Sequence, residues 1–102
     1  MYRNAKDYEI ELKLVNFYKT KENEIIDKIV EFLHISDFLY NNQDEKYFKY
    51  LYCGCNNIAE NNQTSICLEL FLSESSLRRY RKRYVKLAKY FMEGKSCQPF
   101  KN

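Results

Sequence analysis

The chain has 102 residues, of which 30% are charged and 17% aromatic, and its two glycines and one proline are few for a protein built from hairpins. This composition excludes a disordered chain, which carries far fewer aromatic rings, and predicts a single all-helical domain with one modest core. The net charge of +3 hides a segregation, because residues 1–77 hold 8 basic and 13 acidic side chains, whereas residues 78–102 hold 9 basic ones and only Glu93. Either the carboxy-terminal segment meets a polyanion, or the acidic part of the chain docks on it.

The first predicted helix covers residues 5–19. Its stretch 8–14 also alternates like a strand, but no hairpin partner with a turn signal follows, which favours a helix. The apolar face that we expect this helix to bury consists of Tyr8, Leu12, Val15 and Phe17 or Tyr18.

A second helix begins near Ile25, where apolar residues recur every three or four positions as far as Leu33. Acidic side chains in its first turns suit the helix dipole. The helix continues or restarts through residues 38–40, and the polar residues 41–43 end it. These two helices form the predicted amino-terminal helical pair, residues 1–43.

A third helix begins near Asp44, a residue type that caps helices, and stops before Gly54. Its apolar stripe is Tyr47, Phe48, Leu51 and Tyr52. A polar loop over residues 56–62 follows.

Two further helices complete the predicted helix-turn-helix region, residues 44–94, ahead of a tail over 95–102. A short helix over residues 65–71 leads through a turn at Leu72 into a long helix that ends near Glu93, before Gly94 and Pro99. The predicted caps are Thr64 or Asn62 for the short helix and Ser73 for the long one.

The residues from Ile66 to Tyr80 resemble the helix-turn-helix consensus I-A-x-x-L-G-I-S-x-S-T-V-x-R. Ile66 and Leu70 fit the buried face of the first helix, and Cys67 fits the small-residue position where the two helices cross. One position departs from the consensus, because Phe71 stands where it has Gly. The backbone commonly needs a positive φ there, which costs a residue other than Gly about 1–2 kcal/mol.

The long helix divides its residues between an apolar and a basic face. Leu77, Tyr80 and Tyr84 begin an apolar stripe that reaches Phe91 at three- and four-residue spacing. The other positions carry a run of cations with no acid between them, which repel one another unless a polyanion neutralises them. They are Arg78, Arg79, Arg81, Lys82, Arg83, Lys86 and Lys89.

The candidate DNA-binding residues are those that this register turns toward a major groove. They are Ser73, Glu74, Ser75, Arg78, Arg79, Lys82, Arg83 and Lys86. The guanidinium forks of Arg78 and Arg79 match O6 and N7 of guanine, and the hydroxyls of Ser73 and Ser75 suit phosphate near the helix start.

Three motifs lie between residues 44 and 93: the aromatic-rich helix Tyr47–Tyr52, the hexapeptide Leu-Ser-Glu-Ser-Ser-Leu from Leu72, and Val-Lys-Leu-Ala-Lys-Tyr-Phe from Val85. Together they resemble small phage-type transcriptional regulators, most closely the ArpU- and RinA-like late-gene regulators, which are related in pattern to sigma factor region 4. Members typically read L-x-I-S-x-S-T-x-x-R, then a basic stretch and an A-L-x-x-L-A ending. The resemblance implies a phage or mobile-element origin, DNA binding near promoters and action on transcription.

Other classes of function find little support in the sequence. The single histidine, His34, has no nucleophile placed beside it by a motif, and no Gly-rich phosphate loop is present, so we expect neither enzyme activity nor a cofactor. Cys53 and Cys55 lack a second metal-binding knuckle, so we expect reduced thiols without zinc, with Cys67 buried. No window approaches the roughly 18 apolar residues of a membrane span, and the charged amino-terminal segment is unlike a signal peptide, which predicts a cytoplasmic protein without a membrane partner.

Two functions remain in competition. The first is a sequence-specific regulator of transcription that binds double-stranded DNA, and a homodimer joined through its first two helices would read two half-sites. The alternative is an interaction module that uses the same fold to bind an acidic protein, such as RNA polymerase or a host-defence component.

Overall fold

The computed structural model describes residues 5–54 and 57–93, and every regular element within these ranges is a helix. The five helices are α1 (Ala5–Lys19), α2 (Glu24–Tyr40), α3 (Asp44–Tyr52), α4 (Gln63–Leu70) and α5 (Glu74–Met92). The predicted all-α fold is therefore confirmed, whereas Gly94, Pro99 and the tail lie outside the described residues. None of the described helices is long and apolar enough to cross a membrane.

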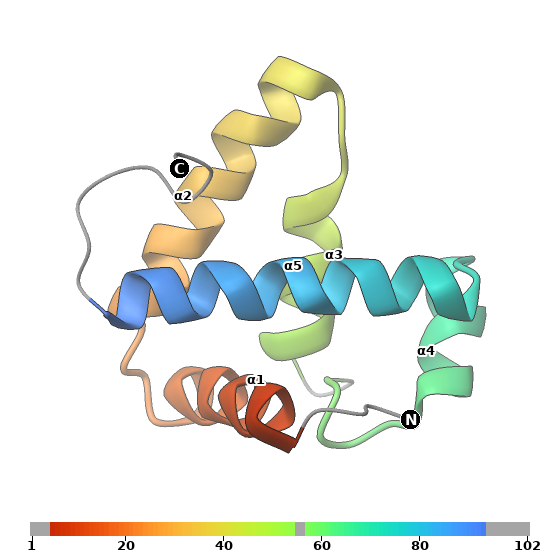
Figure 1. Cartoon of the computed structure of the whole chain (residues 1–102), viewed down its shortest axis with the longest axis horizontal. Coiled ribbons are helices and arrows are strands. Elements are labelled where there is room, and N and C mark those ends of the chain that lie inside the picture. The colour runs from red at the N-terminus through yellow and green to blue at the C-terminus, as the bar shows by residue number, and fades with distance from the viewer. Residues whose placement is uncertain (1–4, 55–56, 94–102) are drawn as a thin grey trace.

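The helix α5 lies across the front of the molecule and contacts each of the other four (Figure 1). Behind it α2 and α3 run side by side, α1 lies below, and α4 stands at the amino-terminal end of α5. The five helices together measure 35 × 31 × 25 Å. One face of α5 is thus packed along its whole length while the opposite face points away from the body.

Aromatic rings of α3 and α5 fill the centre of the core. The ring of Phe48 lies 5.1 Å from that of Tyr52 and 5.4 Å from that of Tyr84, and all three residues are fully buried. The Tyr84 hydroxyl donates a hydrogen bond to the Asp44 carbonyl oxygen at 2.8 Å, which satisfies its polar end inside the core. The predicted apolar stripe of α3 is the one that is buried, with Tyr47 at its half-buried edge.

The buried face of α1 differs from the predicted one. Leu14 and Val15 are buried, but Tyr8 and Leu12 are exposed, and fully buried Glu11 takes a central position on this face. An apolar pattern does not reveal this arrangement, because a carboxylate enters a core only where a cation meets it.

That cation is Arg81 of α5, which is only 4% exposed. Its Nε and Nη2 atoms donate to the two carboxylate oxygens of Glu11 at 3.0 and 2.8 Å, a bidentate ion pair. The Tyr52 hydroxyl donates to the same carboxylate at 2.6 Å, and Arg81 Nη1 donates to Gln63 Oε1 at 3.3 Å. This cluster therefore links α1, α3, α4 and α5. The prediction that Arg81 faces outward with the other cations is wrong.

The joint between α2 and α3 depends on Asp37. Its carboxylate oxygens accept hydrogen bonds from the backbone N–H groups of Asp44 and Glu45 at 3.0 and 2.8 Å, which caps the amino terminus of α3. The predicted cap, Asp44, is instead the first residue of that helix. The α2 helix is continuous to Tyr40, and Asn41 ends it in the left-handed conformation.

Residues 71–73 join α4 to α5, and α4 begins and ends earlier than the predicted helix over residues 65–71. Asn62 Oδ1 caps α4 by accepting from the Ser65 N–H at 2.8 Å, and Ser73 Oγ caps α5 by accepting from the Ser76 N–H at 3.1 Å. Phe71 adopts φ 58°, the left-handed conformation for which the consensus uses Gly, and its side chain is 94% exposed. The backbone at Phe71 is therefore strained, as expected. The Phe71 ring makes no core contact that would offset this strain.

We expect Arg81→Met to reduce the free energy of unfolding by about 3–5 kcal/mol, because it leaves the Glu11 carboxylate buried without its cation. The triple variant Glu11→Leu, Tyr52→Phe and Arg81→Met removes the buried carboxylate together with the two side chains that donate to it, and it should recover most of that loss. Urea denaturation followed by circular dichroism measures both values. A single variant as stable as the parent protein would contradict a desolvated ion pair.

We expect Phe71→Gly to stabilise the fold by about 0.5–1 kcal/mol, because Gly adopts this φ without strain and the exposed ring contributes nothing to the core. The matched control is Phe71→Ala, which removes the ring but keeps the strained Cβ and should change stability by less than about 0.5 kcal/mol. Thermal unfolding resolves the difference, since 1 kcal/mol shifts Tm by about 4–8 °C in a domain of this size. Equal shifts for the two variants would show that the ring, not the backbone, matters.

Candidate nucleic-acid interface

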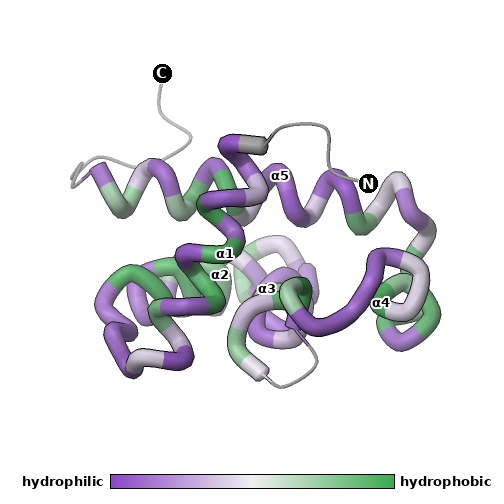
Figure 2. The backbone as a smooth tube through the Cα atoms, turned by 90° about the horizontal axis from the view of Figure 1, so that it is seen from below, coloured by the Kyte–Doolittle hydropathy of each residue, from purple (hydrophilic) through white to green (hydrophobic). Residues whose placement is uncertain are grey.

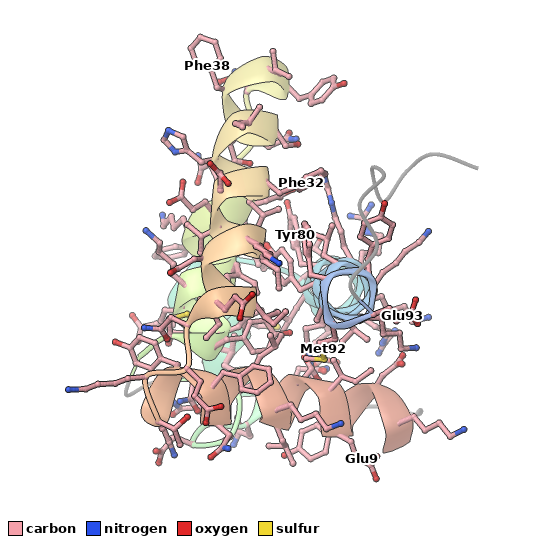
Figure 3. All side chains as sticks on the ribbon, turned by 90° about the vertical axis from the view of Figure 1, so that its left-hand side faces the viewer. Glu9, Phe32, Phe38, Tyr80, Met92 and Glu93 are labelled. Carbon is pink, nitrogen blue, oxygen red and sulfur yellow. The ribbon has the colours of Figure 1, made fainter. Side chains whose placement is uncertain are left out.

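The exposed face of α5 carries a row of cations. Arg78, Arg79, Lys82 and Lys86 are all exposed, and they follow the three- and four-residue spacing of one helix face. We call these four residues the basic stripe. Figure 2 shows hydrophilic residues recurring along the whole of α5, and Figure 3 shows side chains projecting from α5 on the side away from α2. The stripe lies opposite the buried residues Leu77, Tyr84 and Ala88.

Three of the seven predicted outward cations are neutralised within the molecule. Besides Arg81, the Arg83 guanidinium lies 2.8 Å from an Asp44 carboxylate oxygen, and Lys89 Nζ lies 3.2 Å from Asp7 Oδ1. Burial raises the pKa of the Asp44 carboxyl, and the charge of Arg83 acts in the opposite direction. The docking of acidic residues on the basic helix, one of the two expectations from the charge segregation, therefore accounts for part of the run.

The basic stripe differs from these three. Among residues 5–54 and 57–93, no ion pair joins Arg78, Arg79, Lys82 or Lys86 to a carboxylate. Eight residues separate Arg78 from Lys86, which is about 12 Å along a helix. This length is close to the roughly 12 Å width of the DNA major groove. The four cations of the basic stripe therefore lie on a helix segment whose length matches the width of the major groove.

The amino terminus of α5 orders one arginine of the stripe. The Ser73 hydroxyl donates to Ser76 Oγ at 2.9 Å, and Arg79 Nη2 donates to that same Ser76 oxygen at 3.3 Å. Ser73 is therefore occupied by the cap and by Ser76, whereas Ser75 only approaches it, with 3.3 Å between their hydroxyl oxygens. The predicted phosphate contact suits exposed Ser75 better than Ser73.

The structure brings most of the eight predicted residues onto one surface. Ser75, Arg78, Arg79, Lys82 and Lys86 lie together on the exposed face, with Ser73 and Glu74 at its start. Arg83 lies at its edge, half-buried in its pair with Asp44.

The buried role of Arg81 left a signal in the sequence. It stands four residues after Leu77 and three before Tyr84, which is the spacing of the apolar face. A basic residue on an apolar face indicates a buried carboxylate elsewhere in the chain. Glu11, between two apolar residues of the first helix, is its counterpart.

Two exposed apolar side chains beside the stripe were not predicted as functional. Leu68 near the end of α4 and Phe71 in the turn are among the most exposed large hydrophobic residues of the described chain. Phe71 lies three residues before the start of α5, and Leu68 lies six residues before it on α4. A surface that is basic on one helix and apolar on the next suits recognition of a macromolecule.

The cysteines and the histidine of the described residues were the remaining candidates for metal binding or catalysis. Cys53 and Cys67 are free, and burial raises the pKa of each thiol, that of Cys53 to about 11. Within the described ranges no group of three or more His, Cys, Asp or Glu side chains could hold a metal ion, while Cys55 and Cys97 lie outside them. His34 is exposed, and its Nδ1 atom lies 3.0 Å from Glu45 Oε1.

Comparison with known proteins identifies no matching family model, no similar curated protein and no similar solved structure. The resemblance to ArpU- and RinA-like regulators therefore stays a prediction from three short motifs. The case for a function depends on the geometry of α4 and α5.

Proposed function

We propose that this protein binds double-stranded DNA through α5 and regulates transcription in the manner of the phage-type regulators that its sequence resembles. The observation that carries the proposal is the basic stripe, four exposed cations that pair with no carboxylate of residues 5–54 and 57–93, on the second of the two helices joined by the turn at Phe71. Phosphates would neutralise these charges and release their counterions.

The distribution of acidic partners favours an external polyanion. Glu11 and Asp44 pair with Arg81 and Arg83 on the buried side and at the edge of α5, while Asp7 pairs with Lys89, which is exposed three residues after Lys86. No other part of the described chain covers the outward side, so the acidic half of the molecule does not compensate the stripe. A polyanion of another molecule fits this surface, and a duplex groove fits its length.

Individual roles follow from position along α5. Arg78 and Arg79 lie in its second turn, close to the amino terminus that enters the groove in helix-turn-helix proteins, and are suited to guanine edges. The hydrogen bond from Arg79 to Ser76 limits the rotamers of its guanidinium before DNA arrives, which lowers the entropy cost of a base contact. Lys82 and Lys86, farther along, are suited to phosphates.

A second candidate function has its own observation. Exposed Leu68 and Phe71 lie beside the start of α5, and a strained, exposed aromatic side chain is a typical interface anchor. This pair favours a protein such as RNA polymerase as an additional or alternative partner. Binding of purified polymerase that is lost in Leu68→Ser/Phe71→Ser, with DNA affinity unchanged, would assign that role.

We expect Arg79→Ala to weaken binding to a selected DNA sequence by about 1–3 kcal/mol and to relax its specificity, because a base contact is lost. Lys86→Ala should weaken selected and unrelated duplexes alike. Fluorescence anisotropy against duplexes obtained by DNA selection measures both effects. The charge-matched control is Lys13→Ala, on the exposed side of α1 two residues after Glu11, and it should leave affinity unchanged. Equal losses for Lys13 and Arg79 variants would point to net charge rather than to α5.

We expect the logarithm of the DNA association constant to fall with the logarithm of salt concentration at a slope of about −2, for the two phosphate contacts of Lys82 and Lys86. Lys86→Ala should reduce the steepness of that slope by about 1. Anisotropy titrations at several salt concentrations give the slope. An affinity that is independent of salt, or absent at low salt, would end the DNA-binding proposal.

A further inference from the structure

The carboxy-terminal end of α2 carries a second surface that the DNA-binding proposal does not use. Ile35, Phe38, Leu39 and Tyr40 are each more than half exposed, and Phe38 reaches 85%. We call these four residues the α2 tip. Figure 3 shows Phe38 at the end of α2 farthest from α1, pointing away from the body of the molecule. Ile35, Phe38 and Leu39 follow the i, i+3, i+4 spacing of a helix face that buries itself against a partner.

The α2 tip is held firmly, so its exposure is a built feature of the fold. On the opposite side of the same turn, the Asp37 carboxylate accepts the two backbone hydrogen bonds that cap α3. His34 Nδ1 lies 3.0 Å from Glu45 Oε1 one turn earlier. Leu33 anchors this part of the helix in the core. The apolar face of the α2 tip is therefore exposed to solvent although this end of the helix is held in place by the rest of the fold.

We propose that the α2 tip binds the α2 tip of a second copy of this chain, giving a two-fold symmetric homodimer. Its four side chains expose on the order of 500 Å² together, taking roughly 200 Å² for a large side chain. This is enough for the apolar centre of a stable interface, which buries about 800 Å² per partner when its polar rim is included. The tip contains no charged side chain, so two copies meet without the repulsion that two basic stripes would suffer.

The position of the tip suits a dimer that would read DNA. In Figure 1 the α2 tip forms one end of the molecule, and α5 crosses near the middle. The molecule measures 31 Å along this direction, so two copies joined tip to tip have centres roughly 30 Å apart, close to the 34–36 Å between half-sites one DNA turn apart. A two-fold axis along the viewing direction keeps both α5 helices on the same side. This use of the dimer rests on the proposed function, whereas the dimer itself does not.

Sedimentation equilibrium of the full chain without DNA tests the interface. The apparent mass should rise from 12.5 kDa toward twice that value with increasing protein concentration, over roughly 1–300 µM. Phe38→Asp should raise the dimer Kd at least about 30-fold, since it places a charge at the centre of the contact. The matched control is Phe71→Asp, which changes an equally exposed Phe outside the tip and should leave Kd unchanged. Circular dichroism confirms that both variants keep their helices.

A chain that stays at 12.5 kDa throughout, or a loss of association that is equal in the two variants, would overturn the proposal. DNA affinity is measured separately, so a dimer that ignores DNA contradicts only the proposed function, and a monomer that binds DNA contradicts only the interface. In a dimer that binds DNA, two inverted half-sites one turn apart should bind at least about 10-fold tighter than half-sites offset by half a turn. Phe38→Asp should abolish this preference.

Discussion

The fold depends on one buried ion pair. Glu11 and Arg81 are 70 residues apart in sequence, and their bidentate contact joins the first helix to the last, with Tyr52 of α3 as a third partner. Such a pair adds little net stability, because desolvation of both charges offsets their attraction. Its consequence is geometric, since a planar guanidinium that meets two carboxylate oxygens tolerates little rotation of either helix. The pair therefore fixes how α5 turns about its own axis.

This rotation decides which cations are free. Successive residues of a helix lie about 100° apart, so a shift of one position would carry Lys82 into the buried place of Arg81 and Arg81 into the half-buried place of Tyr80. In the observed register, the acids of α1 and α3 pair with Arg81, Arg83 and Lys89, and none of the described ion pairs involves the basic stripe. The positive charge of residues 78–93 thus has two parts. One part holds the helix in place, and the other faces outward.

Features that depend on residues close together in the sequence were predicted better than features that depend on contacts between helices. The bounds of α1 and the cap Ser73 were predicted correctly, and Asn62 was one of the two caps expected for α4, because these features are set by residues within four positions. The apolar face of α1, the cap of α3 and the burial of Arg81 were predicted wrongly, because each depends on a partner from another helix. A periodicity rule treats an acid or a base as solvent-facing, and it cannot know that two such residues will meet in the core. Of the eight predicted site residues, those on the outward face needed only the helical period, whereas Arg83 needed knowledge of Asp44.

The turn between α4 and α5 is strained at Phe71. A left-handed turn aligns the two helices whether Gly or Phe occupies it, so the geometry does not require an aromatic side chain there. The Phe side chain costs stability and, at 94% exposure, gains no packing within the chain. Exposed aromatic rings commonly contribute to binding when a partner buries them. The turn, the start of α5 and the basic stripe are contiguous along the chain, so a partner that covers Phe71 lies beside the surface that we propose for DNA. If this unit binds DNA as we propose, a protein partner at Phe71 would therefore compete sterically with the DNA or adjoin it.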